Sequence, residues 1–224
     1  MLLLSTPRLF FVLEQSWTEP FLVLLLAATV FCAIRLPWAT PLALGLLLAS
    51  KQYMPAVLVL LPLVACQSHL ARRESRRAKW GYAALAVLVA VLVTLPLALW
   101  DWRAFWKSAV TLQVNQPYRP DSLSVLAWYG QGDGYWQGPA WIAFAALALM
   151  LMLTLWRCPR RVWGFAAAVA VCFFMFFAFS KQAFANYYFF VIGAMSCAVA
   201  ALATEADAQT VAADATRTES SQRL

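Results

Sequence analysis

The sequence predicts an all-α protein of the polytopic membrane class, and three observations support this prediction. The chain of 224 residues is 63% hydrophobic and 12% charged, with a mean hydropathy of +0.70, whereas a soluble domain carries about twice that share of charge. Apolar stretches recur at lengths near the roughly 20 residues that cross a bilayer as a helix. Tryptophans gather at the ends of these stretches, which is typical of anchors at the membrane interface.

The apolar stretches predict about seven membrane segments, separated by polar or basic turns. Two of the segments are short and lie next to each other within 37–67. The expected segments cover residues 17–34, 37–50, 53–67, 80–100, 139–156, 162–179 and 187–203. The tryptophans at their ends are Trp17, Trp80, Trp100, Trp141, Trp156 and Trp163.

Two short basic loops predict how the segments are oriented. Residues 69–79 contain five lysines or arginines and residues 157–161 contain three, and such loops remain on the cytoplasmic side. The loop 101–138 is then external, the N-terminus is external and the C-terminus is cytoplasmic. We expect residues 1–203 to form the transmembrane helical domain. The tail 204–224 is polar and poor in large apolar residues, and its composition favours a disordered cytoplasmic tail.

The stretch 37–67 allows two interpretations. As one helix it is too long for a hydrocarbon core of about 30 Å unless it is strongly tilted or kinked. As two runs, each gives a short helix of about 21 Å. We favour a hairpin of two short helices with Lys51 and Gln52 at its external tip. The single kinked helix remains the alternative, and it gives six segments with the N-terminus inside.

The tripeptide Ser-Lys-Gln occurs twice, at 50–52 and 180–182, next to apolar runs each time. A single lysine at a helix end can extend its amine to the lipid headgroups without any further role. Two such lysines on the external side, each followed by glutamine, favour a shared polar site. Lysine suits a phosphate as a point charge, and amides can orient phosphate or a sugar hydroxyl. The candidate ligands are Lys51, Gln52, Lys181, Gln182, Asn186 and Tyr187.

Two further charged residues have both a structural and a functional interpretation. Glu19 begins the first clear span, where a carboxylate stabilises the positive end of the helix dipole; alternatively, it is an external carboxylate that faces the lysines and acts in catalysis. Arg119 lies in the external loop 101–138 and is a candidate phosphate ligand, although a surface arginine fits as well. The first part of that loop, 101–113, has the apolar spacing of an amphipathic helix lying on the membrane.

Several other chemistries lack a pattern in the sequence. The five cysteines fall in or beside apolar runs without paired spacing, so they are expected to be small core residues, with no metal site. The only histidine, His69, lies in a basic loop. No basic soluble domain exists to hold nucleic acid, so the positive charge is assigned to membrane topology.

The segments "LGLLLASKQYMPAVLVLLPLV", "SKQAFANYYFFV" and "EQSWTEPFLVLLL" resemble segments of the GT-C class of integral-membrane glycosyltransferases, which includes polyprenol-dependent mannosyltransferases and aminoarabinose transferase-like families. Gly45, Lys51, Pro55 and Pro62 fit the first segment. The resemblance implies a multi-pass protein of a bacterial inner membrane that transfers a sugar from a polyprenyl-phosphate carrier on the external face, with no other cofactor. A carboxylate would act on the acceptor hydroxyl, and Lys51, Lys181 and Arg119 would hold the leaving phosphate.

One departure from that class leaves alternatives open. The class carries a catalytic acidic pair after its first membrane helix, and the start of this sequence has no such pair in an external loop. Either the first helices are absent, or Glu19 serves instead, or the chain is catalytically incomplete. We favour the first alternative, because an external N-terminus before the first span suggests the C-terminal portion of a longer enzyme. The chain would then hold the lipid-binding part, with the catalytic base in the missing helices or in a partner chain. The alternatives outside this class are a transporter or flippase of a lipid-linked or anionic solute, and a non-catalytic subunit of a membrane assembly.

Overall fold

The computed structural model describes residues 3, 9–64, 76–117, 119, 121–130, 139 and 141–222. Within these residues the chain is all-helical, as predicted, and no strand occurs. The helices within residues 9–64 are α1 (Leu9–Glu14), α2 (Glu19–Arg35), η1 (Pro37–Ala39), α3 (Thr40–Ser50), η2 (Met54–Leu60) and α4 (Leu61–Val64). The later helices are α5 (Arg76–Trp100), α6 (Trp102–Trp106), η3 (Lys107–Thr111), α7 (Leu112–Asn115), α8 (Val125–Gly130), α9 (Trp141–Arg157), α10 (Val162–Ala178) and α11 (Ala185–Gln222).

The stretch 37–64 is interrupted at Lys51. Helix α3 ends at Ser50, Lys51 adopts an extended conformation with φ −152° and ψ 152°, and the chain turns before η2 begins at Met54. Pro55 lies in the first turn of η2, where its missing N–H costs no helical hydrogen bond. The two short helices predicted for this stretch are therefore present, and a continuous helix is not; residues 65–67 lie outside the described part.

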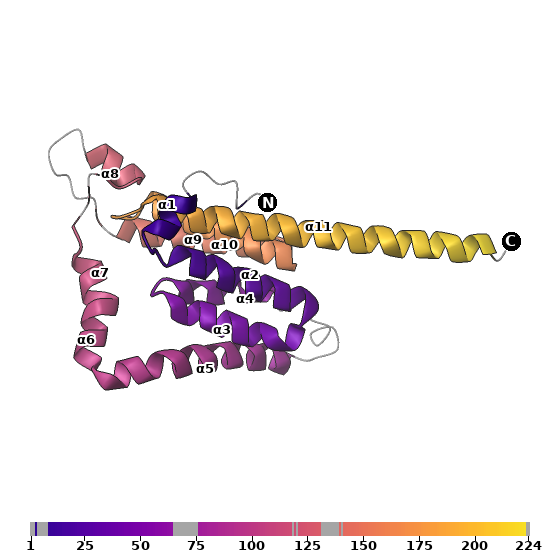
Figure 1. The fold of residues 1–224 in the computed structure, drawn as a ribbon, viewed down its shortest axis with the longest axis horizontal. Helices are drawn as coiled ribbons and strands as arrows, with labels where there is room; N and C mark the ends of the chain where they lie inside the picture. The colour runs from indigo at the N-terminus through magenta and orange to yellow at the C-terminus, as the bar shows by residue number, and fades with distance from the viewer. Residues whose placement is uncertain are drawn as a thin grey trace.

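The long helices run side by side along the long axis of the molecule (Figure 1). Helix α2 packs against α3, α10 and α11, and α3 packs against α5. Helices α6 and α7 turn away from the end of α5 and run across the bundle axis (Figure 1). We call the end of the bundle where α2 begins and α3 ends the Lys51 end, and the end where α2 ends and α10 begins the Arg161 end.

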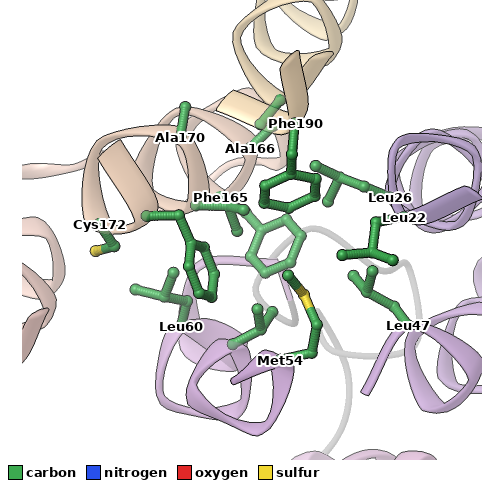
Figure 2. Packing of buried hydrophobic residues seen from close by; sticks show 14 of the residues in the cluster. Leu22, Leu26, Leu47, Met54, Leu60, Phe165, Ala166, Ala170, Cys172 and Phe190 are labelled. Carbon is green, nitrogen blue, oxygen red and sulfur yellow. The ribbon is translucent and has the colours of Figure 1, made fainter. Parts of the chain in front are cut away.

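The core lies between α2, α3, η2, α10 and α11. Figure 2 shows side chains from these helices converging on one apolar centre. Phe165 and Phe190 contribute the rings, and Leu22, Leu47 and Met54 fill the space beside them; all five side chains are fully buried. This packing fixes the relative positions of the ends of α2, α3 and α11, which carry the polar residues of interest.

Glycine allows α3 and α5 to approach closely. A Cβ atom at Gly45 would lie 2.6 Å from the Ala86 carbonyl oxygen and 2.6 Å from the Val89 Cβ. Small residues at helix contacts permit this kind of close packing in membrane proteins. Gly45 therefore positions α3, and with it Lys51, against α5.

In the described part of the chain, two helical stretches are long and apolar enough to cross a membrane, Trp80–Trp100 and Ala185–Val211. The predicted bundle of seven spans is not confirmed, because the other apolar helices have 17 residues or fewer. Most side chains of Trp80–Trp100 are exposed although the stretch is apolar. An exposed apolar surface of this kind is typical of contact with lipid or with another apolar partner.

The C-terminal segment differs from its predicted disorder. Helix α11 continues to Gln222 and thus includes most of the tail 204–224. Residues 204–222 contain five alanines and neither glycine nor proline, so nothing in this sequence interrupts a helix that already extends from the core. Composition indicates how little apolar surface a segment can bury. It does not indicate that a helix nucleated in the preceding residues continues into the segment.

Candidate functional site

A buried carboxylate lies at the Lys51 end. Glu19 begins α2, and its side chain is 1% exposed. The Lys51 ammonium donates a hydrogen bond to Glu19 Oε1 and forms an ion pair with it, while the Lys51 side chain is 19% exposed. The carboxylate also stabilises the positive end of the α2 dipole. The ammonium is thus the member of the pair that an incoming anion can reach.

Aromatic rings enclose the ion pair. The Lys51 Nζ lies 5.6 Å from the centre of the Tyr53 ring and 5.2 Å from the centre of the Tyr187 ring. These distances lie within the range of cation–π attraction. Behind them, Phe177 packs on Tyr187 at 4.8 Å and on Tyr53 at 5.5 Å between ring centres. The residues that hold Lys51 therefore come from α2, the 51–53 turn, α10 and α11.

Three buried polar atoms in these elements have no hydrogen-bond partner within the described residues. They are Glu19 Oε2, the Tyr53 hydroxyl and Asn186 Oδ1. Buried polar groups in proteins are nearly always hydrogen-bonded, and an exception needs an explanation. Glu19 also lies within electrostatic range of both the Tyr53 and Tyr187 hydroxyls. A substrate hydroxyl or a water molecule at this end would satisfy such atoms.

The second lysine has different partners. Lys181 Nζ donates hydrogen bonds to the carbonyl oxygens of Val114 at 3.0 Å and Gln116 at 3.3 Å, and Gln182 Nε2 donates to the Pro117 carbonyl at 3.1 Å. These contacts connect the segment before α11 to the end of α7. The structure thus assigns Lys51 to a carboxylate and Lys181 to backbone carbonyls, so two lysines with the same local sequence have separate environments.

Further contacts extend this connection to Ser122 and Leu123. Ser122 Oγ accepts a hydrogen bond from the Ala183 N–H at 2.7 Å, and the Leu123 N–H donates to the Ala183 carbonyl at 2.6 Å. The Tyr188 hydroxyl donates to the Leu123 carbonyl at 2.5 Å. We call these contacts, together with those of Lys181 and Gln182, the 114–188 latch.

Arg119 lies in the same region and contacts a carboxylate and an aromatic ring. It forms two hydrogen bonds with the Asp121 carboxylate, at 3.0 and 2.7 Å, and its guanidinium lies 5.0 Å from the centre of the Phe184 ring. The hydrogen bonds from Arg119 hold the pKa of Asp121 below its ordinary value of 3.8. Arg119 would have to leave this carboxylate before it could bind a phosphate.

The predicted site residues therefore fall into two groups. Glu19, Lys51 and Tyr187 meet at the buried ion pair, with Asn186 adjacent to Tyr187 in the chain. Lys181, Gln182 and Arg119 belong to the 114–188 latch or its loop. Gln52 is exposed in the turn beside Lys51. His69 lies outside the described residues.

Two residues of this end were not predicted as site residues. Tyr53 covers Lys51 and carries an unpartnered buried hydroxyl, and its place directly after the first Ser-Lys-Gln tripeptide is the signal that could have identified it. Ser122 joins the loop to Ala183, and nothing in the sequence indicates a contact between residues 61 positions apart. Among the described residues no group of three or more His, Cys, Asp or Glu side chains could hold a metal ion.

The geometry of the Lys51 end permits one kind of chemistry. A cation with partial access can bind an anionic group, and a carboxylate with a free oxygen can accept a hydrogen bond from a hydroxyl. The surrounding aromatic and aliphatic side chains lower the local dielectric and strengthen both interactions. Comparison with known proteins adds no family to this description, since the chain matches no protein-family model, no curated protein and no solved structure.

Proposed function

We propose that the chain is a multi-pass membrane glycosyltransferase of the GT-C type, or the lipid-donor-binding part of one. It would transfer a sugar from a polyprenyl-phosphate carrier to an acceptor at the Lys51 end, on the external face of a bacterial inner membrane. The observation that supports the proposal is the Glu19–Lys51 ion pair, in which the carboxylate is buried and keeps one oxygen without a partner. Ionisable residues among membrane helices are functional candidates because burying them is costly.

The distribution of charge supports the proposed orientation. Arg35, Arg157, Arg160 and Arg161 all lie at the ends of α2, α9 and α10 that face the Arg161 end. Basic residues next to short membrane segments remain cytoplasmic, so the Lys51 end would be external. Helices of 17 residues reach about 25 Å, which is compatible with a span across a thin or locally thinned bilayer.

In the proposed reaction the donor phosphate approaches the accessible side of Lys51. As the phosphate takes the ammonium as its counter-ion, the Glu19 carboxylate is released from its partner and becomes the acceptor for a proton from the incoming hydroxyl. The bond from the acceptor oxygen to the sugar forms while the bond from the sugar to the phosphate breaks, and Lys51 stabilises the negative charge that remains on the phosphate. The Tyr53 hydroxyl is available to donate to the phosphate or to the sugar, and Asn186 Oδ1 is available to accept from a sugar hydroxyl.

In this proposal the closed 114–188 latch positions the start of α11 and does not itself take part in the transfer. Lys181 and Gln182 hold the end of α7 beside the entrance of α11, whose second and third residues are Asn186 and Tyr187. Opening the latch at Lys181 would free its ammonium as an additional cation for the phosphate. Arg119 would become a further cation only after leaving the Asp121 carboxylate. The contacts of Ser122, Leu123 and Tyr188 would keep the loop beside α11 while the donor is bound.

The experiment is transfer of tritiated mannose, and in parallel aminoarabinose, from a polyprenyl-phosphate carrier in membranes that contain the full chain. We expect Lys51→Met to lower transfer on the order of 100-fold, as for removal of a donor that stabilises developing charge. Glu19→Gln should lower transfer by a similar or larger factor. Lys107→Met is the matched control, since this exposed lysine lies on η3 and outside both groups.

A double variant separates loss of chemistry from loss of folding. Glu19→Gln combined with Lys51→Met leaves no unpaired buried charge, so it should accumulate in membranes like the parent chain. It should still transfer no sugar. Transfer by this double variant at the parental rate would overturn the proposal. Movement of the labelled lipid across the bilayer without transfer would support the transporter alternative, and a stable complex that lacks both activities would support the assembly subunit.

A further inference from the structure

A cavity of about 970 Å³ lies at the Arg161 end, far from the ion pair at the Lys51 end. The end of α2, the start of α10 and the middle of α11 form its walls. Arg35, Arg160 and Arg161 line it together with Glu205 and Asp207. The proposed sugar transfer uses none of these residues.

The charges in the cavity favour an anionic ligand. Arg161 forms an ion pair with Glu205, and this contact joins the start of α10 to α11. Within the described residues no ion pair involves Arg35 or Arg160, and both side chains are exposed. Three arginines against two carboxylates leave one net positive charge in the cavity, which matches the single negative charge of a phosphodiester.

The remaining walls are apolar. Ile34, Trp163, Ala201 and Val211 line the same cavity as the arginines. Ala201 and Val211 belong to the stretch Ala185–Val211, which is apolar enough to cross a membrane. Tryptophan is enriched at the level of the lipid headgroups. A free inorganic anion would use the arginines only, whereas a phospholipid would use the arginines and the apolar walls together.

We propose that this cavity binds the phosphodiester headgroup of an anionic phospholipid, with Arg35 and Arg160 as its ligands and the apolar walls beside its acyl chains. Basic cavities between membrane helices are a recurring site for anionic lipid headgroups. Arginine is the suitable cation, because its planar guanidinium forms paired hydrogen bonds with phosphate oxygens. The Arg161–Glu205 pair keeps α11 in place as one wall.

The test is native mass spectrometry of the detergent-purified full chain, titrated with phosphatidylglycerol, phosphatidylcholine or glycerol phosphate. We expect phosphatidylglycerol to bind more tightly than the other two. Arg35→Gln and Arg160→Gln should each weaken the first bound phosphatidylglycerol about fivefold, from a contribution of about 1 kcal/mol for each basic residue near the headgroups. Asp207→Asn removes a negative charge from the cavity and should tighten the same binding.

Two comparisons make the test decisive. Arg157→Gln removes a charge three positions before Arg160, at the end of α9, but Arg157 does not line the cavity and lies instead on the Trp156 ring, 4.5 Å from its centre. Its binding of phosphatidylglycerol should equal that of the parent chain, and an equal loss in Arg157→Gln and Arg160→Gln would overturn the proposal. Equal binding of phosphatidylcholine, or binding of glycerol phosphate as tight as that of the lipid, would overturn it as well. Tighter binding by Asp207→Asn cannot result from misfolding.

Discussion

Lys51 and Glu19 are 32 positions apart in the chain and meet as an ion pair at the end of the helix bundle. The carboxylate is almost fully buried, and two tyrosine rings cover the ammonium. Bringing two charges into an apolar bundle is costly unless they remain together. The pair is therefore the point at which stability and the proposed function are most closely coupled.

Removing one member of this pair should destabilise the fold. Lys51→Met leaves the Glu19 carboxylate buried without a counter-ion, which costs about 3–5 kcal/mol in comparable pairs; the 19% exposure of the Lys51 side chain places our expectation near the lower value. The double variant Glu19→Gln with Lys51→Met should recover most of this loss. Denaturant-dependent unfolding in detergent micelles measures the free energy of unfolding of both variants. A double variant as unstable as Lys51→Met would contradict the prediction.

Two glycine substitutions should change stability in opposite directions. Gly45→Ala places a Cβ 2.6 Å from the Ala86 carbonyl oxygen, and overpacking of this kind costs about 1–3 kcal/mol. Gly81→Ala is the matched control on α5, since no described atom outside the neighbouring backbone of α5 lies within 4 Å of the added Cβ. It should stabilise the helix by about 0.5–1 kcal/mol. Thermal unfolding of both variants tests this, and stabilisation by Gly45→Ala, as expected for Gly81→Ala, would show that α3 and α5 do not pack closely at Gly45.

Loss of the Lys181 amine should loosen the end of α7. Lys181→Met removes hydrogen bonds to the Val114 and Gln116 carbonyls, each worth on the order of 1 kcal/mol at a partly exposed site. Loss of both bonds amounts to about 2 kcal/mol, so amide hydrogen exchange in residues 112–116 should become about 30-fold faster. Lys107→Met supplies the control, and unchanged exchange in Lys181→Met would mean that the latch does not order this segment.

The pKa of the Asp121 carboxyl should depend on Arg119. Hydrogen bonds from Arg119 lower the pKa of Asp121 below 3.8. The stabilisation of the folded loop by this contact is thus fully present above pH 3.8 and is lost as the pH falls through the lower pKa of the folded state. Arg119→Gln should raise the pKa toward 3.8. A pH titration of the Asp121 carboxyl-carbon resonance by NMR measures this, and an unchanged pKa in Arg119→Gln would contradict the assigned cause.

The helical segments and their polarity could be predicted because they depend on local properties. The apolar runs, the break at Lys51 and the concentration of arginines at 157–161 are features of neighbouring residues, and helix formation responds to them directly. The number of membrane spans could not be predicted in the same way. Several apolar helices have 10–17 residues, and at that length a short membrane span and a buried core helix have the same composition. The helical state of 204–222 was missed because it continues a helix that the core holds in place.

The sequence by itself determined that this chain is helical and apolar, with polar residues collected at the ends of its helices. Only the tertiary structure decided which of those residues are partners. Lys51 and Lys181 have the same tripeptide sequence, yet one contacts a carboxylate 32 positions away and the other a carbonyl 67 positions away. The physical reason is that these contacts depend on how α2, α3, α10 and α11 pack around Phe165 and Phe190, and such packing is a property of surfaces that are distant in the sequence.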